Sequence, residues 1–160
     1  MKNHSKVFRL LHPLLFSAFA ILFLFSHNIE QVELIDLWIP MGISILFAIV
    51  VLGLARLVVR DADKAAVATS LFLIIFYSYG HVRNLLLEDF PVIMWRHRNL
   101  MIGSSAIFLL ATYTVWKTRL ALRGLNRVLT WVSMALVVIT MTKIVSYELA
   151  RPAVVFAGLP

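Results

Sequence analysis

Apolar residues gather in five long stretches along the chain, separated by short polar segments. The stretches run from about Leu10 to Phe25, Leu37 to Val59, Ala65 to Leu87, Leu100 to Trp116 and Val128 to Leu149. Each approaches the ~20 residues that a helix needs to cross a hydrocarbon core of ~30 Å. Because hydrocarbon offers no water to backbone N–H and C=O groups, each stretch is expected to be helical. The pattern predicts an all-α membrane protein, a bundle of five transmembrane helices.

Composition supports one transmembrane domain over residues 1–160. The chain is 61% hydrophobic and 14% charged, whereas a soluble domain is roughly half apolar and about a quarter charged. The five stretches use nearly the whole chain and leave connections too short for a soluble domain. The sequence contains no cysteine, which excludes disulfides and thiolate nucleophiles.

The basic residues divide unevenly between the two sides of the predicted bundle. Ten lie on the side of the N-terminus, and the other five (Arg83, Arg96, Arg98, Lys143 and Arg151) lie on the opposite side. The positive-inside rule then places the N-terminus in the cytoplasm and the C-terminus outside. The net charge of +7 follows from this asymmetry. We expect no nucleic-acid partner, because the basic residues lie in short loops beside membrane spans.

The ends of the spans predicted to face outward carry a distinct set of polar residues. Four of these ends bring imidazole, phenol, amide and basic side chains to one membrane face. The candidate binding residues are His27, Asn28, Tyr77, Tyr79, His81, Asn84, Arg96, His97, Arg98, Lys143 and Tyr147. We expect them to form a polar pocket for a lipid headgroup at the outer membrane surface.

Spacing supports a shared site, although a simpler interpretation stays open. Tyr77, His81 and Asn84 are spaced i, i+4 and i+7, so they share one face of the third helix. Lys143 lies several residues inside its span, where a charge is costly unless it is paired or reaches the interface. The simpler interpretation is that the Tyr and Trp residues form an interfacial belt while Arg and Lys extend to lipid headgroups.

Other chemistry is weakly supported by the sequence. His27, His81 and His97 are all predicted on the outer side, but no paired-histidine spacing indicates a metal site. We therefore expect no metal or other cofactor. No serine lies in a nucleophile elbow, and we assign no role to His12. The middles of the spans are expected to be apolar, which argues against a transporter or pump, since a proton relay needs titratable groups across the membrane.

Four segments resemble a known family in order and spacing. They are residues 26–32 (SHNIEQV), 76–82 (FYSYGHV), 96–98 (RHR) and 146–148 (SYE). Together they resemble the N-terminal membrane domain of bacterial sulfatase-like hydrolases and transferases of the alkaline phosphatase superfamily. The resemblance extends from about Leu11 to Glu148. It implies a bacterial cytoplasmic membrane location and an outside C-terminus, because such domains precede an extracytoplasmic catalytic domain.

No catalytic residue is carried over from that family, since the sequence ends a few residues after the fifth span. We therefore expect a membrane anchor or lipid-docking module that is not catalytic by itself. Its expected partners are membrane lipids and either a sulfatase-like catalytic domain or other membrane subunits. A small structural or assembly subunit of a larger membrane complex is the main alternative, and a free-standing lipid- or ion-binding protein is a third.

The predicted topology can be tested with single cysteines, because the native chain has none. A cysteine at Gln31 should react with an impermeant thiol reagent on intact cells, whereas a cysteine at Gly124 should react only after the membrane is opened. Labelling of the Gly124 position alone on intact cells would show that the orientation is inverted.

Overall fold

The computed structural model describes residues 7–8, 10–89 and 97–151, and within them it is helical with no strand. Five long helices are α2 (His12–His27), α3 (Trp38–Val59), α4 (Ala62–Asp89), α5 (His97–Lys117) and α6 (Arg123–Ala150), and a short 3-10 helix η1 (Leu34–Leu37) precedes α3. All five predicted helices are therefore confirmed, with ends that differ from the predicted ones by a few residues.

Four of these segments are long and apolar enough to cross a membrane: Leu34–Val59, Ala62–Leu86, His97–Lys117 and Arg123–Ala150. The helix α2 is apolar but has only 16 residues, which at 1.5 Å per residue is about 24 Å. The apolar stretch of α2 is thus shorter than those of the other four long helices, although α2 packs against three of them.

Local sequence explains where several helices begin and end. Asp61 caps α4, since its Oδ1 accepts the backbone N–H groups of Asp63 at 2.9 Å and Lys64 at 3.1 Å. Lys64 in turn donates from Nζ to the carbonyl oxygens of Trp116 and Thr118, both at 2.8 Å. The last carbonyl groups of a helix have no N–H partner within that helix, so a cation beside them is favourable.

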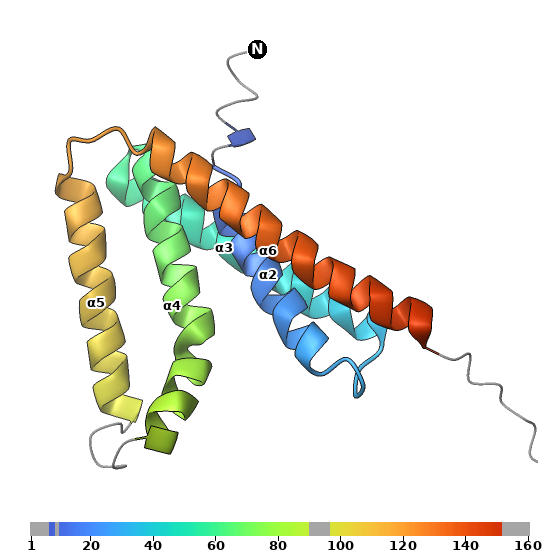
Figure 1. Ribbon diagram of the computed structural model, residues 1–160. Helices are drawn as coiled ribbons and strands as arrows, with labels where there is room; N and C mark the ends of the chain where they lie inside the picture. The colour runs from blue at the N-terminus through green and yellow to red at the C-terminus, as the bar shows by residue number, and fades with distance from the viewer. Residues whose placement is uncertain (1–6, 9, 90–96, 152–160) are drawn as a thin grey trace, which may run out of the picture.

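Alternating helix directions give the bundle two ends (Figure 1). The His12 end holds the starts of α2, α4 and α6, and the His27 end holds the ends of these helices and the starts of α3 and α5. The helix α2 packs against α6, α3 and α4, whereas α5 packs mainly against α4. In Figure 1, α4 and α5 diverge from α2 and α6 toward the His27 end.

Large apolar side chains cover much of the bundle surface. Only 6% of the most apolar part of α5 is buried, and Leu57 and Val58 on α3 are 77% and 81% exposed. Exposed apolar area on this scale is unfavourable in water and favourable in hydrocarbon. A small cluster of buried apolar residues lies toward the His27 end. It consists of Leu22, Phe25, Ile29, Leu37 and Ile144.

Candidate functional site

The predicted outer-face residues do not converge on one point. Tyr77 and His81 line a pocket between α2 and α4 together with Phe23, and His27 stacks on the Phe23 ring. Tyr79 and His97 meet between α4 and α5, and Arg98 is exposed on the next position of α5. The structure thus separates Tyr77 and His81 from Tyr79 and His97, which line a different pocket.

The remaining predicted residues lie around these two groups. Asn28 caps α2 by donating from Nδ2 to the carbonyl oxygen of Leu24 at 2.8 Å. Tyr147 packs against the apolar cluster of α2 and α6, while Lys143 and Asn84 are exposed. Arg96 lies outside the described residues.

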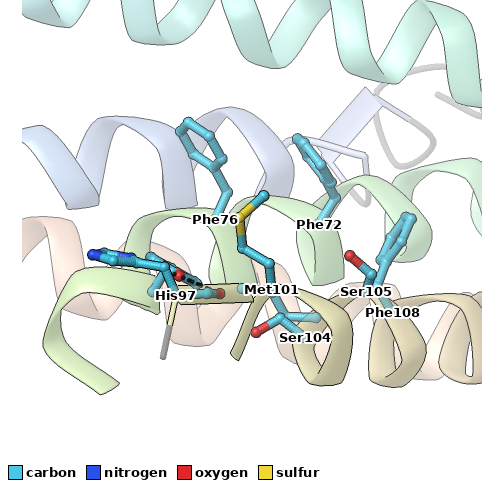
Figure 2. A pocket seen from close by; sticks show the side chains of 9 residues that line it. Phe72, Phe76, His97, Met101, Ser104, Ser105 and Phe108 are labelled. Atoms are coloured by element: carbon cyan, nitrogen blue, oxygen red, sulfur yellow. Dashed lines mark hydrogen bonds between the residues drawn. The ribbon is translucent and has the colours of Figure 1, made fainter. Parts of the chain in front are cut away.

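The first pocket, called the α4–α5 pocket, is a cavity of about 410 Å³ between these two helices. Figure 2 shows aromatic rings from both helices around it, with His97 at one end. The pocket is lined by Phe72, Ile75, Phe76 and Tyr79 from α4 and by His97, Met101, Ser104, Ser105 and Phe108 from α5. Its volume lies within the ~300–1,000 Å³ range of small-molecule sites.

Polar groups mark the end of the α4–α5 pocket that lies nearest to the start of α5. The Tyr79 hydroxyl lies 3.2 Å from Nδ1 of His97 and donates to the His97 carbonyl oxygen at 3.3 Å. The two rings are stacked, with centroids 6.3 Å apart. Arg98, the next residue of α5, is exposed. An imidazole and a phenol therefore lie at one end of a mainly apolar pocket.

The second pocket, called the α2–α4 pocket, is a cavity of about 470 Å³. It is lined by Phe16, Phe19, Ala20, Ile21, Phe23 and Leu24 from α2, by Leu73, Ile74, Tyr77, Ser78 and His81 from α4, and by Leu136 from α6. The Phe23 ring stacks on His27 with centroids 6.3 Å apart, and it meets His81 edge-on at 5.8 Å. Two imidazoles therefore flank one phenyl ring at the His27 end.

Hydrogen-bonded side chains are buried at the His12 end. His12 Nε2 lies 2.8 Å from Oδ1 of Asn126, and His12 Nδ1 lies 2.6 Å from the Ser70 hydroxyl. Asn126 donates from Nδ2 to the backbone carbonyl and the carboxylate of Asp63, both at 3.1 Å. The Asn126 oxygen therefore accepts from Nε2–H, and a neutral His12 accepts the Ser70 hydrogen at Nδ1.

This polar network (Asp63, Ser70, His12 and Asn126) joins α2, α4 and α6. His12 and Asn126 are 0% exposed and Ser70 is 1% exposed. A serine bonded to an imidazole that is oriented by an amide has the connectivity of a nucleophile–base pair. However, none of the three lines the α4–α5 or the α2–α4 pocket. We therefore assign the network a structural role between the helices.

A second buried chain lies nearer the middle of the bundle. The Ser44 hydroxyl of α3 is 2.6 Å from the Ser17 hydroxyl of α2 and 2.6 Å from the Tyr77 hydroxyl of α4. Ser17 also donates to the Ser44 carbonyl oxygen at 2.7 Å. The expectation of apolar helix middles is therefore wrong here, since hydroxyls inside the bundle link three helices.

The spacing of polar residues along α4 could have predicted these interior contacts. Asp63, Ser70 and Tyr77 recur every seven residues and so share one face of α4. Each of them bonds to a different helix, namely α6, α2 and α3. His12 was missed because its partners are 58 and 114 residues away in sequence.

The three histidines considered for a metal site do not meet. His27 and His81 flank Phe23, whereas His97 stacks on Tyr79 in the other pocket. Within residues 7–8, 10–89 and 97–151, no group of three His, Cys, Asp or Glu side chains is arranged to hold a metal ion.

Comparison with known proteins does not place the chain in a family. No family model matches it, and no curated protein or solved structure is significantly similar to it. The resemblance to sulfatase-like membrane domains therefore rests on the four short segments alone and stays a hypothesis.

The structural role of the polar network predicts a specific loss of stability. Asn126→Ala leaves the His12 Nε2–H group buried without an acceptor, which typically costs about 1–3 kcal/mol. Unfolding of the protein in mixed micelles should therefore occur at lower denaturant concentration. The control is Asn84→Ala, which removes an exposed amide from α4 and should change stability by less than about 0.5 kcal/mol. Equal stability of the two variants would contradict the assigned role.

Proposed function

We propose that this chain is a multi-pass protein of the bacterial cytoplasmic membrane that docks an anionic lipid, as a membrane anchor or lipid-docking module. The observation that carries the proposal is the α4–α5 pocket. It is a mainly apolar cavity of about 410 Å³ with Tyr79 and His97 at one end, and the exposed Arg98 follows His97 on α5.

The apolar part of this pocket suits a hydrocarbon chain. Phe72, Phe76 and Phe108 supply aromatic surface, and Phe72 meets Phe108 edge-on with centroids 5.6 Å apart. Met101 adds a flexible side chain that adapts to irregular ligands. Both helices belong to the segments that are long and apolar enough to cross a bilayer, so an acyl chain reaches the pocket directly from the membrane.

The polar end of the pocket suits a phosphate-bearing headgroup. Arginine binds phosphate oxygens through paired N–H groups. The Tyr79 hydroxyl and the His97 imidazole supply further hydrogen bonds. His97 and Arg98 are the first residues of α5, so they lie at the level where a membrane-spanning helix meets the headgroup region.

We further propose that the N-terminus lies in the cytoplasm and that the His27 end faces outward. Ten basic residues against five support this orientation. The lipid would then be bound from the outer half of the membrane. A sulfatase-like catalytic partner, acting on lipid-linked groups at the outer surface, is consistent with that orientation.

A structural or assembly subunit is the second candidate function. The supporting observation is α5, whose apolar part is only 6% buried and which packs mainly against α4. Its exposed surface includes Gly103 and Ala106, where a neighbouring helix can approach closely. Loss of a stable membrane complex on Ala106→Trp, with lipid binding retained, would favour this function over lipid docking.

Lipid docking predicts a charge-selective binding defect. Arg98→Ala should weaken binding of phosphatidylglycerol by about fivefold, as expected for one basic side chain near an anionic headgroup. Native mass spectrometry of the purified protein titrated with this lipid measures the change. Arg119→Ala, an exposed arginine beyond α5 at the opposite end of the bundle, is the control and should leave binding unchanged. Equal effects of the two variants would argue for non-specific attraction.

The apolar part of the site predicts a steric defect. Ser105 lines the α4–α5 pocket, whereas the next residue, Ala106, is exposed and does not line it. Ser105→Trp should fill the cavity and abolish phosphatidylglycerol binding, and Ala106→Trp should leave it intact. The lipid-docking proposal fails if both variants bind the lipid like the native protein.

We propose that the chain is not catalytic by itself, and Ser70 gives the sharpest test. A fluorophosphonate reagent labels serines that an accessible base activates. Since Ser70 is 1% exposed, the native protein in detergent micelles should remain unlabelled at this residue. Labelling of Ser70 that disappears in His12→Ala would overturn the structural assignment and indicate a hydrolase.

A further inference from the structure

Neither the α2–α4 pocket nor the α4–α5 pocket is lined by Asp, Glu, Lys or Arg. The polar members of the α2–α4 lining are Tyr77, Ser78 and His81, all toward the His27 end of α4. A phosphate headgroup would find no cation among the residues that line the α2–α4 pocket, whereas in the α4–α5 pocket the lining residue His97 is followed on α5 by the exposed Arg98.

His81 is the polar group most available to a ligand in this pocket. The Tyr77 hydroxyl is bonded to Ser44 at 2.6 Å, and the Ser78 hydroxyl is directed to the Ile75 carbonyl oxygen at 3.4 Å. His81 is exposed, and its ring forms no hydrogen bond to another described residue. A neutral imidazole has one donor and one acceptor nitrogen. It therefore complements a hydroxyl or a carbonyl oxygen.

The size of the cavity restricts what can occupy it. Its volume of about 470 Å³ lies within the ~300–1,000 Å³ range of small-molecule sites. A hydrocarbon chain fits, and the rings of Phe16, Phe19 and Phe23 supply an apolar wall for it.

The polar network sets the depth of the cavity. Phe16 and Leu73 line the pocket, and they lie four and three residues after His12 and Ser70, about one helical turn away. Leu73 is 0% exposed and Phe16 is 9% exposed, so they close the cavity toward the network. From Leu73 to His81 the helix rises about 12 Å at ~1.5 Å per residue, which gives the depth available to a chain.

We infer that the α2–α4 pocket is a second binding site, which takes an uncharged amphiphile with a hydroxyl or carbonyl head and a hydrocarbon tail. The head bonds to His81 at the His27 end, beside Phe23 and His27. The tail lies along Phe19 and Leu73. This site is separate from the proposed anionic-lipid site, so either one can fail without the other.

Two probes test the inference and distinguish a hydroxyl head from a carbonyl head. Farnesol carries a hydroxyl, and decylubiquinone carries carbonyls. Each is titrated into the purified full chain and bound copies are counted by native mass spectrometry. We expect saturable binding of at least one probe. His81→Phe, which keeps the aromatic contact and removes the hydrogen bond, should weaken that probe at least fivefold. His97→Phe, the matched change in the other pocket, should not.

A steric variant provides an independent readout. Ala20 lines the α2–α4 pocket and Ala106 lines neither pocket. Ala20→Trp should abolish probe binding while phosphatidylglycerol binding and the thermal midpoint stay as in the native protein. Ala106→Trp and Arg98→Ala should both bind the probe normally.

Three results would overturn the inference. They are no saturable binding of either probe to the native protein, equal loss in His81→Phe and His97→Phe, and loss of phosphatidylglycerol in Ala20→Trp with the fold intact. The last result would assign the anionic lipid to this pocket instead. If Ala20→Trp does not fold, the comparison of His81→Phe with His97→Phe still decides the question.

Discussion

Hydrogen bonds from His12 to Ser70 and Asn126 hold three helices together at one end of the bundle, and the rest of the arrangement depends on them. In a bilayer, apolar side chains are as well accommodated by lipid tails as by each other. Close packing and polar partners therefore decide which helices associate. Here one imidazole uses both ring nitrogens, at 2.6 and 2.8 Å, to link α2 to α4 and to α6. The Ser17–Ser44–Tyr77 chain adds α3 to the same set.

These contacts explain why cavities lie toward the other end. Asp63, Ser70 and Tyr77 bind α4 to its neighbours from its first turn to just past its middle, while the last part of α4 and all of α5 diverge from α2 and α6 (Figure 1). The pockets along the diverging segments are lined mainly by aromatic and aliphatic side chains, with a few polar ones such as Tyr79, His97 and His81. No charged residue lines either pocket, and the two pockets differ in that the exposed Arg98 follows the lining residue His97 at the start of α5. That difference is the physical basis for proposing two kinds of ligand.

Hydropathy predicted which segments are helical, but it did not predict which face of each helix is turned toward its neighbours. The helix bounds follow from runs of apolar residues and from caps such as Asp61, which are local properties. The division of the predicted site between two pockets depends on contacts between helices that are distant in sequence. Tyr77 and Tyr79 are neighbours in sequence but lie about 200° apart around a helix, so one hydroxyl bonds to Ser44 inside the bundle and the other reaches His97. His12 likewise received no role, because its significance lies in partners on two distant helices.

Photo-crosslinking can determine whether a membrane lipid occupies the α4–α5 pocket. A phosphatidylglycerol with a diazirine midway along one acyl chain is incorporated into nanodiscs with the protein, activated by light, and its adducts are mapped by peptide mass spectrometry. If the lipid occupies the pocket, the adducts should concentrate on the pocket residues Phe76, Met101 and Phe108. Adducts spread evenly over the exposed apolar side chains of α3 and α5, such as Leu57 and Leu109, would show that the lipid only surrounds the protein and does not dock in the pocket.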